Sequence, residues 1–264
     1  MHPLIERASN IYRKEGGFAL ARMAAKKPLD WLILLEPFDT ICYIQSLKRL
    51  RSRMEAEEDL DDILDTAFNY RGFGLYKSIK PKQIRYELKK LADAVKQQEP
   101  SIIMEIGTSR GGTFYTWCRY IDSAYKMISM NLPGSRFMFG TNYPEKYTRF
   151  LRQFSDDKKM YFLRCDSHSR KTIEKLQNVI GTEKIDFLLI DGDHRYEGVK
   201  QDFEMYKEFV SEHGMIAFHD IVPHPYSSDC EVDKFWNEIK DSYDTEEIIS
   251  SPDQIWAGIG LIHL

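Results

Sequence analysis

Short apolar runs alternate with longer amphipathic segments in the part of the chain that follows Pro81. Apolar residues at helical spacing predict a helix that starts near Pro81, then helices over residues 112–122, 145–154, 169–180, 196–211 and 232–241. The apolar runs between them have the length of buried strands and cover residues 102–106, 127–131, 160–165, 187–191, 215–219, 245–249 and 255–262. Buried strands that alternate with helices are typical of a mostly parallel sheet with helices on both faces. The pattern therefore predicts an α/β fold.

Residues 1–80 follow a different pattern, in which charged clusters alternate with apolar patches and no strand–turn rhythm is present. They predict an N-terminal helical extension, acting as a lid or an oligomerisation element, ahead of a domain over residues 81–264. The apolar stretch 28–44 is interrupted by charges and is too short to span a bilayer. It predicts a helix that packs on the core, with peripheral membrane contact as the alternative. The aromatic run 68–77 (FNYRGFGLYK) predicts a loop that either closes over a ligand or anchors a linker.

Composition and charge remove several classes of protein from consideration. The chain is 42% hydrophobic and 30% charged, with a net charge of −4, which is ordinary for a globular protein and lacks the basic face of a nucleic-acid binder. Its four cysteines show no CxxC spacing, which indicates reduced thiols. The first ten residues lack the apolar core of a signal peptide. We expect a cytoplasmic protein with no transmembrane segment and no nucleic-acid partner, and leave a homo-oligomer open.

A glycine-rich segment follows the first predicted strand. Glycines at 107, 111 and 112 allow the backbone to approach a ligand just before a helix begins. The spacing differs from the GxGxxG of dinucleotide-binding loops. Glu105, inside the strand, is suited to ordering the loop and to favouring a cationic ligand. The segment predicts a cofactor loop, with a purely structural strand–helix turn as the alternative.

Carboxylates and imidazoles follow the later strands, at the edge of the sheet where ligands bind. Asp191 and His194 lie in a DGDH turn after the fourth strand, and His219 and Asp220 follow the fifth. Adjacent parallel strands bring such residues together, and carboxylates with an imidazole are suited to Mg²⁺ or a similar ion. His194 is interpreted as a general base or as a hydrogen-bonded turn residue.

Asp166 and Ser167 follow the third predicted strand. The Asp166 carboxylate is interpreted either as the acceptor for an adenine amino group or as the N-cap of the next helix. His224, further along the chain, is interpreted as a loop residue.

Three strings together resemble a known family: EIGTSRGGT (105–113), DFLLIDGDHRYEGVKQDFEMY (186–206) and GMIAFHDI (214–221). They resemble class I S-adenosylmethionine (SAM)-dependent methyltransferases, especially the group with cephalosporin-hydroxylase-like and macrocin-type sugar O-methyltransferases. The resemblance covers about residues 70–264. It implies a Rossmann-like sheet of seven strands, the last of them antiparallel.

The resemblance also implies a set of site residues. SAM would bind through its methionine end at Glu105 and Gly107, its adenine end at Asp166, and the residues between and beside them: Thr108, Ser109, Gly111, Gly112, Asn131, Ser167 and Asp191. The divalent cation of the metal-dependent relatives, expected to be Mg²⁺, would be held by Asp191, His219 and Asp220. Two positions depart from the family: Asn131 replaces the usual acid for the ribose hydroxyls, and His219 stands where an oxygen ligand is usual.

The function that these residues imply is methyl transfer from SAM to a hydroxyl of a sugar or glycosylated small molecule. Metal assistance would come through Asp191, and His194 would accept the proton. Two alternatives stay open. One is a catalytically degenerate methyltransferase fold that binds a partner, and the departures at Asn131 and His219 favour it. The other is a nicotinamide-dependent oxidoreductase, against which the missing GxGxxG and the missing acid at position 131 count.

Overall fold

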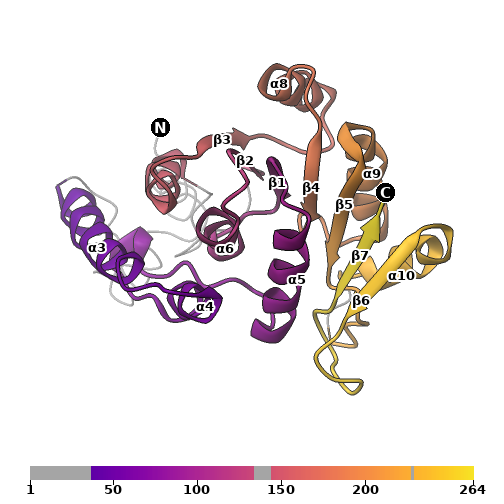
Figure 1. Ribbon diagram of the computed structural model, residues 1–264, viewed down its shortest axis with the longest axis horizontal. Helices are drawn as coiled ribbons and strands as arrows, with labels where there is room; N and C mark the ends of the chain where they lie inside the picture. Colours follow the sequence, from indigo (N-terminus) through magenta and orange to yellow (C-terminus); the bar gives the residue numbers. More distant parts are fainter. Residues whose placement is uncertain (1–36, 134–143, 227–228) are drawn as a thin grey trace, which may run out of the picture.

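A computed structural model describes residues 37–133, 144–226 and 229–264, and shows one sheet with helices on both faces (Figure 1). Its strands are β1 (Ile102–Ile106), β2 (Lys126–Asn131), β3 (Lys159–Arg164), β4 (Ile185–Ile190), β5 (Val210–His219), β6 (Asp244–Ile248) and β7 (Ile259–His263). The longer helices are α3 (Phe38–Met54), α4 (Leu60–Asn69), α5 (Arg85–Gln97), α6 (Gly112–Tyr120), α8 (Arg170–Ile180), α9 (Tyr196–Tyr206) and α10 (Val232–Ile239).

The strand order is β3-β2-β1-β4-β5-β7-β6, with parallel pairing from β3 to β5. β7 runs antiparallel to both of its neighbours, β5 and β6. The α/β class, the seven-stranded Rossmann-like sheet and its antiparallel last strand are therefore confirmed. The chain leaves β1 in one direction for β2 and β3 and returns on the other side as β4, so the switch point of the sheet lies between β1 and β4.

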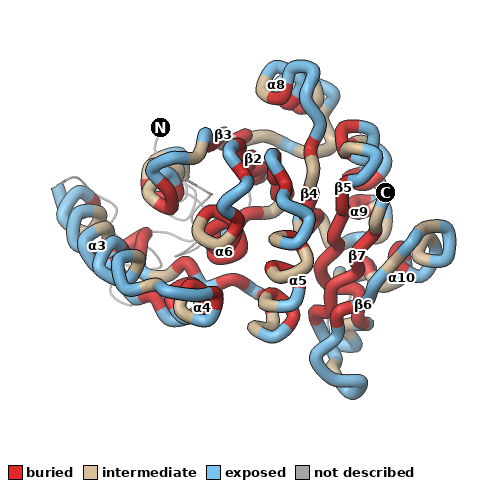
Figure 2. The backbone as a smooth tube through the Cα atoms, viewed as in Figure 1, coloured by how far each residue is buried: buried red, intermediate tan, exposed pale blue. Residues whose placement is uncertain are grey.

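The two faces of the sheet bury separate apolar cores. On one face, α4, α5 and α6 pack over the sheet, with large rings such as Trp117 and Phe187 fully buried. On the other, α8, α9 and α10 pack over side chains that include Phe218 and Trp236. Figure 2 shows the central strands buried along their length and the outer faces of the helices exposed. Successive side chains of a strand point to opposite faces of the sheet, and both faces are covered here. The strands therefore appear in the sequence as continuous apolar runs.

Three segments differ from the predicted elements. The strand predicted over residues 255–262 begins only at Ile259, as β7. The helix predicted over residues 145–154 is divided into η3 (Glu145–Tyr147), α7 (Thr148–Leu151) and η4 (Arg152–Phe154). Such 3-10 turns are frequent at the ends of α-helices, and here they flank a single α-helical turn. The helix predicted over 196–211 ends earlier, at η5 (Lys207–Phe209), and β5 begins at Val210. Pairing of Val210 with Ile185 on β4, across a register shift, extends the strand beyond its apolar run.

The described part of the N-terminal region packs on the same core as α6. Asp39 on α3 is fully buried and pairs with Lys146 (3.1 Å) and Arg149 (2.9 Å). Tyr70 and Tyr76 of the aromatic run are buried, and the Tyr70 hydroxyl donates to the Ser46 carbonyl at 2.9 Å. The run 68–77 therefore anchors α3 and α4, the second of its two interpretations. The predictions for residues 1–36 lie outside the described residues.

Two further features of the described residues bear on the predictions from composition. None of their helices is both long enough and apolar enough to cross a membrane. All four cysteines, Cys42, Cys118, Cys165 and Cys230, are free thiols.

Gly260 on β7 provides a test of the second core. A Cβ at this position would lie 2.7 Å from three ring atoms of Trp236, closer than van der Waals contact. We expect Gly260→Ala to lower the free energy of unfolding by about 1–3 kcal/mol through overpacking, measured by urea denaturation. Because Trp236→Leu removes the ring, the double variant should lose less stability than the two single variants added together. Wild-type stability of Gly260→Ala would contradict this packing.

Candidate active site

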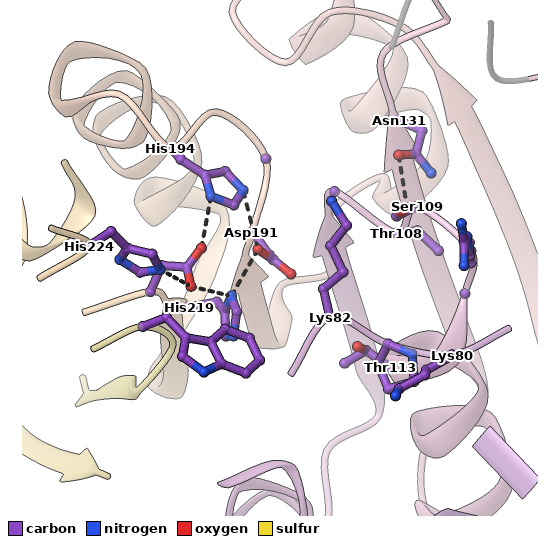
Figure 3. Close-up of a pocket in the computed structure, with 18 residues that line it drawn as sticks. Lys80, Lys82, Thr108, Ser109, Thr113, Asn131, Asp191, His194, His219 and His224 are labelled. Atoms are coloured by element: carbon purple, nitrogen blue, oxygen red, sulfur yellow. Dashed lines mark hydrogen bonds and ion pairs between the residues drawn. The ribbon is translucent and has the colours of Figure 1, made fainter. Parts of the chain in front are cut away.

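A cavity of about 410 Å³ opens at the carboxyl ends of β1, β4 and β5 (Figure 3). The glycine loop forms one side and the residues after β4 and β5 form another, as the switch point predicts. Residues 80–82, ahead of α5, and Trp256, between β6 and β7, also line the cavity. The lining residues are Lys80, Pro81, Lys82, Gly107, Thr108, Ser109, Arg110, Gly111, Gly112, Thr113, Asn131, Asp191, Gly192, His194, His219, Asp220, His224 and Trp256.

Gly107 brings the loop against the backbone of Asp191. Its φ is +98°, and a Cβ there would lie 1.9 Å from the Asp191 carbonyl oxygen. Only glycine is compatible with both the dihedral angle and the contact. Gly111, with φ +86°, is the N-cap of α6, and a Cβ on Gly112 would lie 2.3 Å from the Ile79 carbonyl oxygen. The loop is thus fixed on both sides while its open face lines the cavity.

Hydrogen bonds between β2 and the loop order its first residues. The Ser129 hydroxyl donates to Thr108 Oγ1 at 2.8 Å, and the Ser109 N–H donates to Asn131 Oδ1 at 3.1 Å. The Asn131 side chain is buried, yet its Nδ2 has no hydrogen-bond partner among the described residues. A buried amide donor without a partner is costly in a folded protein, and it lines the cavity. Asn131 therefore offers an N–H to a ligand acceptor.

Glu105 lies beneath the loop on β1, outside the set that lines the cavity. Its carboxylate is buried and accepts a hydrogen bond from Trp117 Nε1 at 3.0 Å. Burial, with the nearby charge of Asp191, raises the pKa of Glu105 to about 8. The side chain supports the loop from below and does not line the cavity.

A second cavity of about 350 Å³ adjoins the first and shares Gly107, Asn131, Gly192 and His194 with it. Asp166 and Ser167 line this second cavity. The Asp166 carboxylate accepts from the His168 N–H at 3.0 Å and makes no hydrogen bond to an N–H of α8, which begins at Arg170. The N-cap interpretation of Asp166 is therefore not supported by the geometry, and its carboxylate remains available at the cavity wall.

The predicted strand-end residues form one cluster of carboxylates and imidazoles. His219 Nδ1 lies 3.3 Å from Asp191 Oδ1 and 3.3 Å from Asp220 Oδ1. His194 Nδ1 lies 2.8 Å from Asp220 Oδ2, and its Nε2 lies 3.5 Å from Asp191 Oδ1. Figure 3 shows the imidazoles facing inward around the carboxylates. Asp220 has a left-handed φ of +69°, a strained conformation of the kind found at functional sites.

The charges of this cluster are strongly coupled. The hydrogen bond to Asp220, then the contact with Cys230, raises the pKa of His194 to about 11. Burial alone would lower the pKa of His219, but the charges of Asp191 and Asp220 outweigh it and raise the value to about 10. Burial likewise opposes ionisation of Asp220, yet the two imidazoles hold its pKa well below the usual range. Without another cation, both imidazoles are protonated and neutralise the two carboxylates.

The cluster also has the composition of a metal site. One ligand atom each from Asp191, His219 and Asp220 lies within 4.8 Å of the others. His219 is buried, and neither ring nitrogen makes a hydrogen bond of acceptable geometry among the described residues. An inward-facing imidazole between two carboxylates fits a divalent cation. His194, Asp220 and Cys230 form a second such group in the described chain.

Sequence reasoning missed several residues of the cavity. His224, interpreted as a loop residue, has its Nε2 3.2 Å from Asp220 Oδ1. Its position only four residues after Asp220 in the sequence could have indicated that the two side chains lie close together. Lys80, Lys82, Arg110 and Trp256 also line the cavity. Of these, only Arg110 lies in a segment that the strand-end rule selects.

Solved structures with the same fold are methyltransferases. An O-methyltransferase from Bacillus cereus in complex with SAH has a TM-score of 0.51 and 16% identity, over 90% of this chain and 97% of that one. A putative O-methyltransferase from Klebsiella pneumoniae has a TM-score of 0.53 and 14% identity, over 85% and 99%. The O-methyltransferase TomG from Streptomyces achromogenes, in complex with SAM, has a TM-score of 0.51 and 13% identity, over 79% and 91%. The protein thus has the class I SAM-dependent methyltransferase fold.

Sequence comparison points to the same class. Residues 104–221 match a family model described as a methyltransferase domain, and the predicted resemblance to class I SAM-dependent methyltransferases is confirmed. An uncharacterised protein of Sinorhizobium fredii is 27% identical over 124 residues, 46% of this chain and 13% of that protein. One of Acanthamoeba polyphaga mimivirus is 44% identical over 43 residues, 16% and 20% of the respective lengths. Both alignments cover a small part of the relative.

The raised pKa of Glu105 predicts a pH-dependent stability. Between its ordinary value of 4.5 and about 8, the folded protein keeps a proton that the unfolded chain has lost. This group therefore lowers stability as pH rises through that range, by at most about 1.4 kcal/mol per pH unit. Glu105→Gln, which mimics the protonated carboxyl, should flatten the slope of unfolding free energy between pH 5 and pH 8. The exposed Glu212→Gln controls for the loss of a carboxylate, and an unchanged slope in Glu105→Gln would contradict the prediction.

Proposed function

We propose that the protein is a SAM-dependent O-methyltransferase assisted by a divalent cation. The observation that carries this proposal is that the glycine loop and the carboxylate–imidazole cluster open onto one cavity. The loop is suited to a cofactor, and the cluster to activating a hydroxyl beside it. The matched methyltransferase domain, which spans both, supports the same assignment.

The cofactor would extend across the two adjoining cavities. Its methionine end would lie on the loop formed by Thr108, Ser109, Gly111 and Gly112, above Glu105. The unpartnered Nδ2 of Asn131 would donate to a ribose hydroxyl, in place of the family's charged acceptor. The adenine end would lie in the second cavity, with the Asp166 carboxylate as acceptor beside Ser167. SAM supplies the methyl group as a sulfonium.

The cluster would prepare the acceptor hydroxyl. A divalent cation held by Asp191, His219 and Asp220 would polarise that hydroxyl, lower its pKa and neutralise the two carboxylates. With this negative charge neutralised, the pKa of His194 would fall toward its ordinary range, and His194 Nε2 would accept the hydroxyl proton. Oxygen ligands favour Mg²⁺, and the nitrogen of His219 also admits Mn²⁺ or Zn²⁺.

The acceptor proposed from the family resemblance is a hydroxyl of a sugar or of a glycosylated small molecule. A hydroxyl acceptor is supported by the fold neighbours, which are O-methyltransferases. The free thiols favour a cytoplasmic location. Residues 1–80 would act as a lid or as an oligomerisation element, and the lid is favoured because Lys80 lines the cavity.

One observation favours a second candidate, a catalytically degenerate methyltransferase fold that binds a partner without catalysis. His194 and His219 already neutralise Asp191 and Asp220 in the absence of a cation. A cluster satisfied in this way does not require a metal. No feature of the described residues favours the nicotinamide-dependent alternative.

Substitution of Asn131 tests the cofactor assignment. Wild-type protein should bind SAM in a calorimetric titration, and Asn131→Ala should bind it about tenfold more weakly. Asn131→Asp restores the family's charged acceptor for the ribose hydroxyls and should bind SAM several-fold more tightly. No SAM binding by the wild type at millimolar concentration would refute the proposed function.

Removal of one carboxylate tests the metal assignment. Binding of Mn²⁺, followed by electron paramagnetic resonance, should be at least about tenfold weaker in Asp191→Asn and in His219→Ala than in the wild type. Asp193→Asn is the matched control, because this neighbouring carboxylate pairs with Arg195 outside the cluster. If Asp191→Asn binds Mn²⁺ as well as the control does, the metal is not held at this cluster.

A further inference from the structure

Three residues that line the larger cavity are basic or aromatic and have no role in the proposed chemistry. They are Lys80 and Lys82, which flank Pro81 ahead of α5, and Trp256 in the connection between β6 and β7. We call these three residues the basic wall. In Figure 3, Lys82 is seen between the carboxylate–imidazole cluster and the Asn131 side of the cavity.

The positive charges at the cavity have no acidic partner. Neither lysine ammonium of the basic wall, nor the guanidinium of Arg110, makes an ion pair or a hydrogen bond within the described parts of the chain. The only carboxylates in the lining are Asp191 and Asp220, which pair with imidazoles. The excess of three positive charges, from Lys80, Lys82 and Arg110, therefore has no free carboxylate to pair with in the described lining.

The cofactor does not balance this excess. SAM carries one carboxylate against an ammonium and a sulfonium, so it adds a net positive charge. Its single carboxylate can be matched by Arg110, which lies on the cofactor loop. Lys80 and Lys82 then face the remaining space with no counter-charge. An anionic group on the second substrate would supply it.

The backbone around Trp256 is held in place although the residue is 43% exposed. The fully buried Glu87 on α5 accepts from the Gly258 N–H at 3.0 Å and from Gln254 Nε2 at 2.8 Å. Gln254 Nε2 in turn donates to the Trp256 carbonyl at 3.0 Å. The backbone on both sides of Trp256 is thereby tied to α5, the helix that follows the two lysines. An exposed indole on a fixed backbone is suited to stacking against a ring.

We propose that the basic wall selects the methyl acceptor, and that the acceptor is a hydroxylated ring bearing a carboxylate or phosphate. Lys80 and Lys82 bind the anion, Trp256 stacks on the ring, and the hydroxyl faces Asp191. Glu87 acts through Trp256 and is a positioning residue. This inference rests on the proposed function, since it names the substrate class of that site.

The test uses D-glucose, D-glucuronate and D-glucose 6-phosphate as probes on the full chain saturated with S-adenosylhomocysteine. Binding is measured by saturation-transfer NMR. At least one anionic probe should bind about tenfold more tightly than glucose, and the stronger of the two identifies the anion as carboxylate or phosphate. Equal affinities for the three probes would overturn the proposal.

Charge reversal assigns the effect to the basic wall. Lys80→Glu and Lys82→Glu should each lower the affinity for the anionic probe about tenfold and leave the affinity for SAM within about twofold of the wild type. Lys175→Glu, at an exposed position on α8, is the matched control and should change neither affinity. An equal loss of SAM and probe affinity would show that the lysines serve the cofactor carboxylate and would overturn the proposal.

Trp256 and Glu87 are tested together. Trp256→Ala should weaken the anionic probe about tenfold, and Trp256→Phe should retain most of the affinity. Glu87→Gln should weaken the probe in the wild-type background and have no further effect in Trp256→Ala. Additive losses would overturn the positioning role. If SAM itself fails to bind the wild type, the proposed function fails, while probe binding to the cofactor-free chain still reports on the wall.

Discussion

The arrangement of the site depends on the close approach of Gly107 to the backbone of Asp191. The Asp191 N–H donates to the Ile106 carbonyl at 2.9 Å, and the Gly107 N–H donates to the Met130 carbonyl at 2.9 Å. The loops after β1, β2 and β4 are therefore joined at one point. Any side chain at position 107 would meet the Asp191 carbonyl and separate them. Because of this contact, the cofactor loop and the acidic cluster form one rigid unit.

The two carboxylates of that unit, buried Asp220 and half-buried Asp191, require compensation, because an uncompensated charge is costly in the interior. Imidazoles provide it from the turn after β4 and from the end of β5. The strained backbone of Asp220 is held by the connection between β6 and β7, where the Ile221 and Val222 N–H groups donate to the Gly258 and Ala257 carbonyls. The C-terminal hairpin thus stabilises the cluster as well as carrying Trp256. Because β7 runs antiparallel to β5, the connection that precedes β7 lies beside the carboxyl end of β5.

Much of the fold follows from the sequence because apolar runs locate buried strands directly. The predicted starts and ends of β1 to β4 fall within two residues of those observed. The predictions of one continuous helix over residues 145–154 and of the start of β5 were wrong, because strand pairing and packing override local periodicity there. The cluster of Asp191, His219 and Asp220 was predicted as a group because parallel strands end at a common edge. Lys80 and Trp256 were not, because only the packing of α5 against the β6–β7 connection brings them to the cavity.

The two walls of the cavity differ in how their charges are satisfied, and this difference separates their roles. The cluster at Asp191 is balanced within itself, so its field on a distant group is weak, and it acts over contact distances. Lys80 and Lys82 are unbalanced and exposed, so their field extends into solvent over roughly a Debye length, about 8–10 Å. Such charges attract and orient an anion before contact. A ring lying on Trp256 would then present its hydroxyls to the cluster, so that recognition and chemistry depend on separate residues of one cavity.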